Sequence, residues 1–338
     1  MKPRKLVIAL VPIMAIAAAC GGSAEKTKSA SGKELDKVTL TLNWYPYGEH
    51  APFYYGKKQR IFEKHGLDLQ INAGQGSQKT VQAIGAGRTD FGWADTPALL
   101  AGVSTGLPVK SVGVFLQTTP ASVQSFTDKG IKKPSDLKGK HIAGTAGDAL
   151  SRTFPAFLKK NGMSESDLRI QNTDPAGKMA AVVSGQTDGL LGFANDQGPT
   201  MHNKSGKPVS YLRFADFGLS FYSNGLLVGD RKLKSQPDLV KRMTAATSEA
   251  WAAAERDPAG AVAAMQGASQ QLPPPAVLAE QFKTTLTLLH TDATKGKAPG
   301  VNTEADWQQT IDLFAQTGVI SKAQPPATYW DAALAPQG

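Results

Sequence analysis

This 338-residue sequence has few of the patterns on which common enzyme and metal sites depend. Its one cysteine is Cys20, so the chain can form no internal disulfide. Its five histidines, at positions 50, 65, 141, 202 and 290, do not have the spacing of metal ligands. The sequence contains no phosphate-binding loop, no H-E-x-x-H zinc motif and no G-x-G-x-x-G dinucleotide motif. We therefore expect no metal, no cofactor and no catalytic residue.

Positive charge is present but is not clustered. The formal net charge is +9, and it falls to +6 without Lys2, Arg4 and Lys5. The sequence has no stripe of lysines and arginines interleaved with aromatic residues, which is the usual footprint of a nucleic-acid-binding surface. The modest excess describes the protein surface, and no nucleic-acid partner is expected.

Long apolar runs are also scarce. The run at 6–19 would span about 21 Å as a helix, which is short of a bilayer core of about 30 Å. Basic residues precede this run, and Ala17-Ala18-Ala19 followed by Cys20 resembles a lipobox. We therefore expect residues 1–20 to be a lipoprotein signal peptide, with Cys20 lipidated and the protein anchored to the extracytoplasmic face of the cell membrane. A secreted protein whose Cys20 carries no lipid is the alternative.

Residues 21–37 are small, polar and charged, and their composition favours a flexible tether. The remaining 300 or so residues are enough for two lobes. In the first part of this body, strand and helix patterns alternate, which predicts mostly parallel sheets covered by helices. The expected strands are 38–43, 67–72, 90–93 and 109–116, and the expected helices are 52–65, 77–84 and 96–101.

The pattern restarts after Pro120. The expected strands are 141–144, 168–171 and 189–192, and the expected helices are 151–160 and 176–183. The stretch 80–98 aligns with 177–198, and Gly-Arg-Thr-Asp at 87–90 matches Gly-Gln-Thr-Asp at 185–188. The match is short enough to be a coincidence, but the elements around it repeat too, which favours two similar lobes. The rest of the chain is helix-rich, with helices expected at 237–255, from 257–258 and at 306–316, and with Tyr329-Trp330 expected to pack on the first lobe.

The loops that follow the expected parallel strands are the candidate ligand site, because open α/β sheets bind ligands at these ends. The first loop belongs to LNWYPYGEHAPFYY (42–55), where aromatic rings alternate with chain breakers that hold the loop shape. Together with the loops after the other strands and residues near the second crossover, it gives the expected ligand-binding set: Asn43, Trp44, Tyr47, Glu49, His50, Gly76, Ser77, Asp95, Thr96, Gly147, Asp148, Asn195, Asp196, Tyr222 and Asn224.

Some of these residues have a purely structural alternative. Trp44, Tyr45 and Tyr47 could form a hydrophobic patch that caps a lobe. His50 could bond the backbone at a helix start, and Ser77 and Asp196 have the residue types of helix N-caps.

Four stretches carry a resemblance to a known family: LNWYPYGEHAPFYYGKKQRIFEKHGLDLQI (42–71), GAGRTDFGWADTPALLAG (85–102), KPSDLKGKHIAGTAG (133–147) and YSNGLLV (222–228). The chain resembles the SsuA/THI5-like (NMT1-type) substrate-binding proteins of ABC importers over nearly all of 38–320. It is most similar to members that bind thiamine-pyrimidine precursors.

The resemblance implies a two-lobed periplasmic-binding-protein fold of type II, α/β in class, with crossover strands near 123–126 and 222–228. Lobe I would be 38–122 plus 228–338, and lobe II would be 123–227. It also implies a monomeric receptor that closes on a small-molecule ligand and delivers it to an ABC permease with a cytoplasmic ATPase.

Two departures bear on the activity. The pyrimidine-synthesising THI5-like relatives rely on a cysteine-rich segment and a pyridoxal-phosphate lysine, whereas this chain has one cysteine. We therefore do not expect an enzyme, although His50 matches the position of the family's pyrimidine-site histidine. Tyr47 and Gly48 stand where those relatives favour small polar residues, which leaves the identity of the ligand open.

Charge ranks the candidate ligands. The loops carry Glu49, Asp95, Asp148 and Asp196, against Arg152 as the one nearby cation. Carboxylates can accept the N–H groups of an aminopyrimidine edge, so a heteroaromatic solute of this kind ranks first. An aromatic carboxylate or sulfonate held by Arg152 and helix N-termini ranks second.

Overall fold

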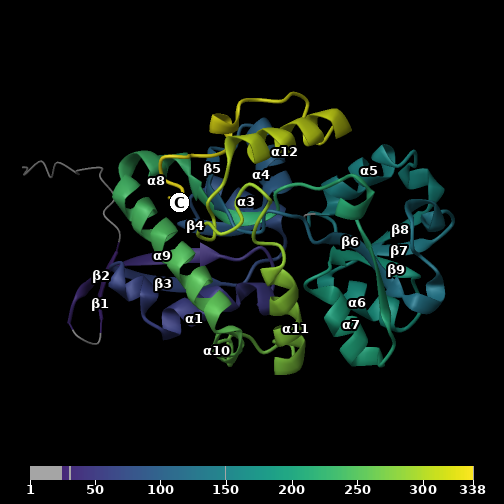
Figure 1. Cartoon of the computed structure of the whole chain (residues 1–338), viewed down its shortest axis with the longest axis horizontal. Coiled ribbons are helices and arrows are strands. Elements are labelled where there is room, and N and C mark those ends of the chain that lie inside the picture. The colour runs from purple at the N-terminus through teal and green to yellow at the C-terminus, as the bar shows by residue number, and fades with distance from the viewer. Residues whose placement is uncertain (1–24, 30–31, 149, 338) are drawn as a thin grey trace, which may run out of the picture.

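The computed structural model describes residues 25–29, 32–148 and 150–337, without the side chains of Arg152 and Pro175. The expected signal peptide and Cys20 lie outside these residues. The described chain forms two β-sheets, each flanked by helices (Figure 1). Within this part of the chain, no helix combines the length and the apolar character needed to cross a membrane.

The first sheet contains strands from both ends of the chain. They are β1 (Lys26–Lys28), β2 (Glu34–Thr41), β3 (Leu67–Asn72), β4 (Phe91–Asp95), β5 (Val109–Val114) and β11 (Asn224–Gly229). β2 pairs in parallel with β3 and β4, and β11 lies between β4 and β5, antiparallel to both. A late strand therefore completes the sheet that the first strands begin.

The second sheet has the order β10-β6-β9-β7-β8. Its strands are β6 (Ala121–Phe126), β7 (His141–Gly144), β8 (Arg169–Asn172), β9 (Gly189–Phe193) and β10 (Val209–Arg213). β7 is parallel to β8 and β9, whereas β6 is antiparallel to β9 and β10. The predicted α/β fold class is confirmed, and both sheets are mixed because β6 and β11 enter them against the direction of the parallel strands.

Helices cover both sheets. Those of the second sheet are α5 (Leu150–Lys160), α6 (Pro175–Val183) and α7 (Gln197–Ser205), on the right of Figure 1. The others are α1 (Ala51–Lys58), α2 (Ile61–Lys64), α3 (Ser77–Gly85), α4 (Thr96–Ser104), α8 (Asp230–Ser235), α9 (Pro237–Arg256), α10 (Pro258–Ala263), α11 (Pro275–Leu286) and α12 (Glu304–Thr317).

Three local expectations were wrong. The helix expected at 52–65 is two helices, because Arg60 has a left-handed φ of 57° that ends one and starts the next. Ser77 is not an N-cap: Gly76 holds that position, and the Ser77 hydroxyl oxygen accepts a hydrogen bond from the Asp95 N–H at 3.2 Å. The tether expected at 21–37 is partly a strand pair, in which β1 and β2 are also joined by a Lys26–Asp36 ion pair at 2.7 Å.

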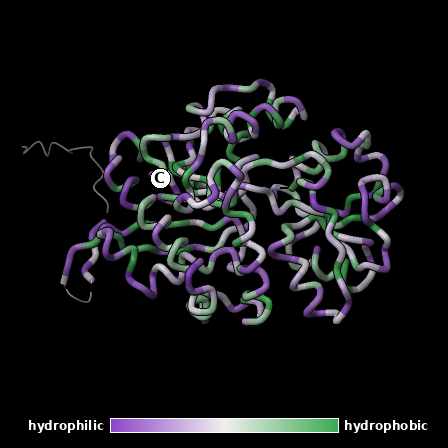
Figure 2. Tube along the Cα trace, in the orientation of Figure 1, coloured by the Kyte–Doolittle hydropathy of each residue, from purple (hydrophilic) through white to green (hydrophobic). Residues whose placement is uncertain are grey.

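Aromatic side chains fill the core beneath the first sheet. Trp93 of β4 stacks on Trp251 of α9, with ring centroids 5.3 Å apart and planes 20° from parallel, and Phe53 and Phe115 pack around them. All four side chains are fully buried, so this cluster fixes β4 and the loop after it. Figure 2 shows such hydrophobic segments inside the sheet regions and hydrophilic segments mainly on the outer turns.

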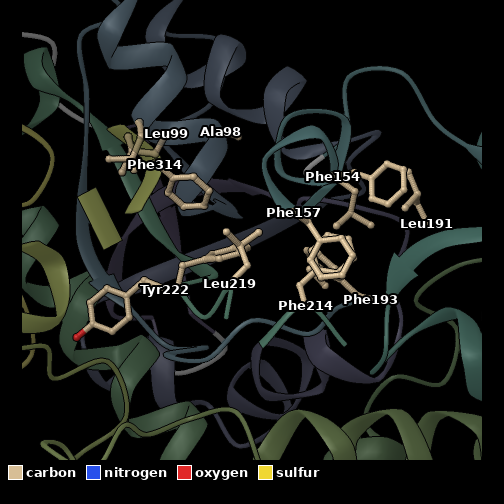
Figure 3. Packing of buried hydrophobic residues seen from close by; sticks show 14 of the residues in the cluster. Ala98, Leu99, Phe154, Phe157, Leu191, Phe193, Phe214, Leu219, Tyr222 and Phe314 are labelled. Atoms are coloured by element: carbon tan, nitrogen blue, oxygen red, sulfur yellow. The ribbon is translucent and has the colours of Figure 1, made fainter. Parts of the chain in front are cut away.

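A second core cluster continues from one sheet region to the other. Phe157 and Phe214 stack with centroids 4.2 Å apart, beside Phe154 (Figure 3). Near the C-terminus, Trp330 forms an isolated bridge to Ser111 of β5, so the end of the chain packs on the first sheet as predicted.

Candidate functional site

A cavity lies between the two sheet regions at the ends of their strands. The cavity is small, with a volume of about 30 Å³, and is partly open to solvent. Seven residues of the expected ligand-binding set line it: Asn43, Trp44, Tyr47, Gly76, Ser77, Asp148 and Asp196. Five lining residues were not predicted, namely Leu150, Lys178, Gly192, Phe193 and Gln197.

The loop after β2 is fixed by a buried histidine. Nδ1 of His50 accepts a hydrogen bond from the Tyr47 N–H at 3.3 Å, so the proton lies on Nε2, which donates to Asn43 Oδ1 at 2.8 Å. Burial lowers the pKa of His50 to about 3, so the ring is neutral. His50 does not line the cavity, and its hydrogen bond orients the side chain of Asn43, which does.

Glu49 forms the centre of a buried network beneath this loop. Its Oε1 accepts hydrogen bonds from Trp93 Nε1 and Asn224 Nδ2, both at 2.6 Å. Its Oε2 accepts from the Tyr47 hydroxyl at 2.5 Å and from Asn195 Nδ2 at 2.9 Å. Burial raises the pKa of Glu49, and these four donors oppose that shift. Since Asn195 follows β9 and Glu49 precedes α1, the network joins the two sheet regions.

Two acidic residues face the cavity from the second sheet region. Asp148 and Asp196 are about nine-tenths buried, and burial raises the pKa of each, that of Asp196 to about 7. Asp196 occupies the N-cap position of α7, but its side chain makes no capping bond and instead accepts from Gln197 Nε2. Asp196 therefore does not cap α7 with its side chain, whose Oδ1 instead accepts a hydrogen bond from Gln281 Nε2 at 3.3 Å.

Lys178 of α6 supplies a cation that the sequence reading missed. Its side chain is 3% exposed, its Nζ lies 3.5 Å from Asp148 Oδ2, and the same atom is 5.3 Å from the centroid of the half-buried Trp44 ring. The expected cation, Arg152, has a side chain outside the described part of the structure.

Gln281 of α11 joins the first loop to the Asp196 loop and was also missed. Its Oε1 accepts from the Gly48 N–H at 2.9 Å, and its Nε2 donates to the Asp196 carbonyl at 2.9 Å. A Cβ on Gly48 would lie 2.5 Å from the Gln281 Cβ, so a glycine is needed there. Gly48 and Gln281 lie 233 residues apart in sequence, so no local pattern could have paired them.

Asp95 lies at the end of β4, opposite Asn224 of β11. Burial raises its pKa to about 8, and its Oδ1 has no hydrogen-bond partner among the described residues. Thr96 follows it and donates its hydroxyl proton to the Ser223 carbonyl at 2.8 Å. Neither Asp95 nor Thr96 lines the cavity, and the same holds for Glu49, Asn195 and Asn224.

Two further residues of the expected set lie elsewhere. Tyr222 packs against Trp307, its hydroxyl lies 3.2 Å from Asp306 Oδ2, and Figure 3 shows it pointing away from the phenylalanine cluster. The Tyr222 side chain therefore packs in the core and does not line the cavity. Gly147 is beside the cavity, where its carbonyl would lie 2.9 Å from a Cβ on Gly76.

The described residues also contain no group of three or more His, Cys, Asp or Glu side chains placed to hold a metal ion. The polar groups at the cavity can instead donate and accept hydrogen bonds around a flat ligand, with Trp44 and Tyr47 offering ring surface.

Comparison with known proteins gives three findings. A family model described as NMT1/THI5 like matches residues 48–261. A protein named as a binding protein of Brucella abortus (strain 2308) is 31% identical over 202 residues, which is 56% of this chain and 58% of that protein. A 4-amino-5-hydroxymethyl-2-methylpyrimidine phosphate synthase of Uromyces fabae is 23% identical over 296 residues, 84% of each chain. The chain thus spans less than two thirds of the length of its Brucella relative.

Among solved structures, the alkanesulfonate-binding protein SsuA of Xanthomonas axonopodis pv. citri, bound to MOPS, superposes with a TM-score of 0.67. The two sequences are 20% identical, and the superposition covers 87% of this chain and 98% of that chain. The chain described here therefore has the fold of the periplasmic binding proteins.

Proposed function

The chain belongs to the NMT1/THI5-like family, and from this we propose that it is an extracytoplasmic solute receptor of an ABC importer. It binds a small heteroaromatic solute between its two lobes and delivers that solute to a permease with a cytoplasmic ATPase. The two lobes are 38–122 plus 228–338 and 123–227.

The composition of the cavity carries this proposal. One wall offers aromatic surface from Trp44 and Tyr47, and the other offers the carboxylates of Asp148 and Asp196. A flat ring can stack on the first wall while its amino group donates hydrogen bonds to the second. The ligand that fits this arrangement best is an aminopyrimidine of the thiamine-precursor kind.

A second ligand class has one observation in its favour. Lys178 gives the cavity a buried cation, which an aromatic carboxylate or sulfonate would pair with. Asp148 and Asp196 oppose this choice, because two carboxylates close to a bound anion raise its electrostatic cost.

The similarity to a pyrimidine phosphate synthase favours an enzyme as the third candidate. His50, at the family's pyrimidine-site position, weighs against it here. Both ring nitrogens are hydrogen-bonded within the protein, the side chain is fully buried, and it does not line the cavity. A receptor that returns its ligand unchanged is the better account.

The test is calorimetric titration of three probes: 4-amino-5-hydroxymethyl-2-methylpyrimidine, an aromatic sulfonate and an aromatic carboxylate. We expect the pyrimidine to bind most tightly and to be recovered chemically unchanged. Tighter binding of an anion would select the second ligand class. Turnover of the pyrimidine would select the enzyme.

The proposal also places the protein on the membrane through a lipid on Cys20. Replacing Cys20 by serine is expected to release the protein from membranes without changing its affinity for solute. Detergent phase partitioning measures this, and a Cys20→Ser variant that still enters the detergent phase would contradict the anchor.

A further inference from the structure

Lys178 is a buried ammonium with too few partners. An ammonium has three N–H donors, yet the one hydrogen bond its Nζ makes with the described residues is to Asp148 Oδ2, at 3.5 Å. The side chain is only 3% exposed, so water cannot readily supply the missing acceptors. A buried charge that is poorly bonded costs free energy, which a ligand acceptor at the cavity would recover.

Backbone N–H groups bond only one of the two carboxylate oxygens of the neighbouring Asp148. Its Oδ1 accepts from the backbone N–H groups of Leu150 at 2.9 Å and Ser151 at 3.0 Å, at the start of α5. These bonds fix the carboxylate and turn Oδ2 toward Lys178. The cavity wall therefore presents a fixed acceptor, Oδ2, beside a donor, Nζ.

Such a pair matches one particular chemical edge. An amino group beside a ring nitrogen presents a donor next to an acceptor, as adenine does to the bidentate side-chain amides that recognise it. Resting on the proposed solute-binding function, we propose that Asp148 and Lys178 together read the amino-imine edge of a nitrogen heterocycle. Lys178 donates to the ring nitrogen, and Asp148 accepts from the amino group.

The position of Trp44 supports this assignment. Lys178 Nζ lies over the Trp44 ring, 5.3 Å from its centroid, so a heterocycle that stacks on Trp44 comes next to the ammonium and to the Asp148 carboxylate that pairs with it. Stacking would come from one lobe and edge recognition from the other, so both are complete only when the lobes are together.

The competing explanation is that Lys178 only neutralises Asp148 or packs on Trp44. The two explanations differ in which ligand atom matters. Edge reading depends on a ring nitrogen, whereas charge neutralisation and packing do not.

The experiment therefore uses two probes and calorimetric titration: 4-amino-5-hydroxymethyl-2-methylpyrimidine and its carbocyclic analogue, in which C–H replaces both ring nitrogens. We expect the wild-type protein to bind the pyrimidine roughly 10- to 100-fold more tightly, because the analogue leaves the ammonium unpaired. Lys178→Met, which keeps the length of the apolar stem, should lose most of that discrimination.

Lys207→Met is the matched control. Lys207 Nζ also lies 5.3 Å from an aromatic centroid, that of Phe126, but Lys207 is exposed and does not line the cavity. We expect this variant to bind both probes as the wild type does. In Lys178→Met the Asp148 carboxylate loses its ion-pair partner, which can prevent folding. The double variant Asp148→Asn/Lys178→Met removes both charges and gives a second protein for the same test.

The outcomes distinguish a failure of the proposed solute-binding function from a failure of the inference about Asp148 and Lys178. If the wild-type protein binds neither probe, the solute-binding proposal for this ligand class is overturned and the edge-reading inference falls with it. If it binds both probes equally, or if Lys178→Met weakens both to the same extent, the edge-reading inference alone is overturned. The edge-reading inference would also be overturned if the double variant distinguished the pyrimidine from its analogue as well as the wild type does. Lys178 would then serve only to neutralise the charge of Asp148.

Discussion

Two polar clusters lie within the same set of loops and differ in how completely they are bonded. Glu49 has four donors on its two oxygens, from Tyr47, Trp93, Asn195 and Asn224. Lys178, by contrast, makes one long hydrogen bond with the described residues, to Asp148. Both clusters are buried, so solvent access does not explain the difference.

The difference separates structural from ligand-binding roles. A buried carboxylate whose two oxygens each accept two hydrogen bonds holds its neighbours in place and has no acceptor left to offer a ligand. A buried group that keeps unused donors or acceptors at a cavity is one that a ligand can complete. We therefore assign Glu49 to holding the two lobes in register, and Asp148 and Lys178 to recognition.

The largest change in stability should follow from removing the charge of Glu49. Glu49→Gln places an NH₂ group against two donors and removes the charge, so we expect the free energy of unfolding to fall by about 3 kcal/mol or more. Urea unfolding of the apo protein measures this. Glu63→Gln, at a more exposed carboxylate with an ion pair to Arg60, is the control and should cost little. Unchanged stability with lost ligand affinity would instead make Glu49 a ligand residue.

A substitution at Trp44, beside Lys178 and Asp148, should lower the affinity for ligand more than the stability of the fold. Trp44 is only half-buried, so Trp44→Ala should leave apo stability nearly unchanged. It should cost about 2–3 kcal/mol of binding free energy, or roughly 30- to 150-fold in dissociation constant, and Trp44→Phe should recover most of the loss. Calorimetric titration and apo melting on the same proteins test this. A large fall in melting temperature with normal affinity would instead show that Trp44 belongs to a hydrophobic patch that caps a lobe.

A smaller effect tests whether the two clusters are brought together by lobe closure. Gly76 has a φ of 119°, and a Cβ there would lie 2.9 Å from the Gly147 carbonyl in the opposite lobe. Gly76→Ala should weaken binding by about 1–2 kcal/mol and reduce the decrease in radius of gyration that ligand causes in the wild-type protein. Small-angle scattering gives that decrease.

Gly185→Ala is the control for this variant, since Gly185 has a φ of 79° but open space around it. It carries the cost of a positive φ, smaller than that of Gly76, without the contact between lobes. Equal effects of the two variants would show that strain, rather than closure, is responsible.

The last effect depends on pH and comes from Asp95. Burial raises the pKa of Asp95 from 3.8 to about 8, so the folded state holds a proton that the unfolded state loses above about pH 4. The corresponding stability is present below pH 4 and is lost as the pH rises toward 8, by at most about 1.4 kcal/mol per pH unit.

Asp95→Asn should therefore flatten the decline of stability between pH 5 and pH 8. Urea unfolding at several pH values shows the slope. The exposed Asp238→Asn variant should keep the wild-type slope. An unchanged slope in Asp95→Asn would mean that Asp95 is ionised in the folded protein.

Local patterns were enough to predict several elements of the fold. β3 (Leu67–Asn72) and β7 (His141–Gly144) have the predicted bounds, since each is a short apolar-rich run bounded by a nearby glycine or polar turn. α11 and α7 were not predicted. The run Pro273-Pro274-Pro275 resembles a chain break, although a proline suits the first turn of a helix.

Only those site residues that directly follow a strand could be predicted from the sequence. Asn43, Asp148 and Asp196 follow strands, and they line the cavity. Lys178 and Gln281 lie within helices, and what brings them to the site is the packing of one lobe against the other, which no local pattern encodes. The packing of Tyr222 against Trp307 was not predictable, because a motif at a crossover does not tell which face of the chain its side chain occupies.

The distribution of tryptophans gives the protein a built-in optical reporter. Trp93, Trp251 and Trp307 are fully buried, so their emission should respond little to solute. Trp44 alone among the five lines the cavity, and it lies beneath the Lys178 ammonium. A ring that stacks on the Trp44 indole would change the surroundings of that side chain, which alters the intensity and wavelength of that one fluorophore. Occupancy of the cleft should therefore be readable from intrinsic fluorescence without any label, and Trp44→Phe should silence the signal while keeping most of the affinity.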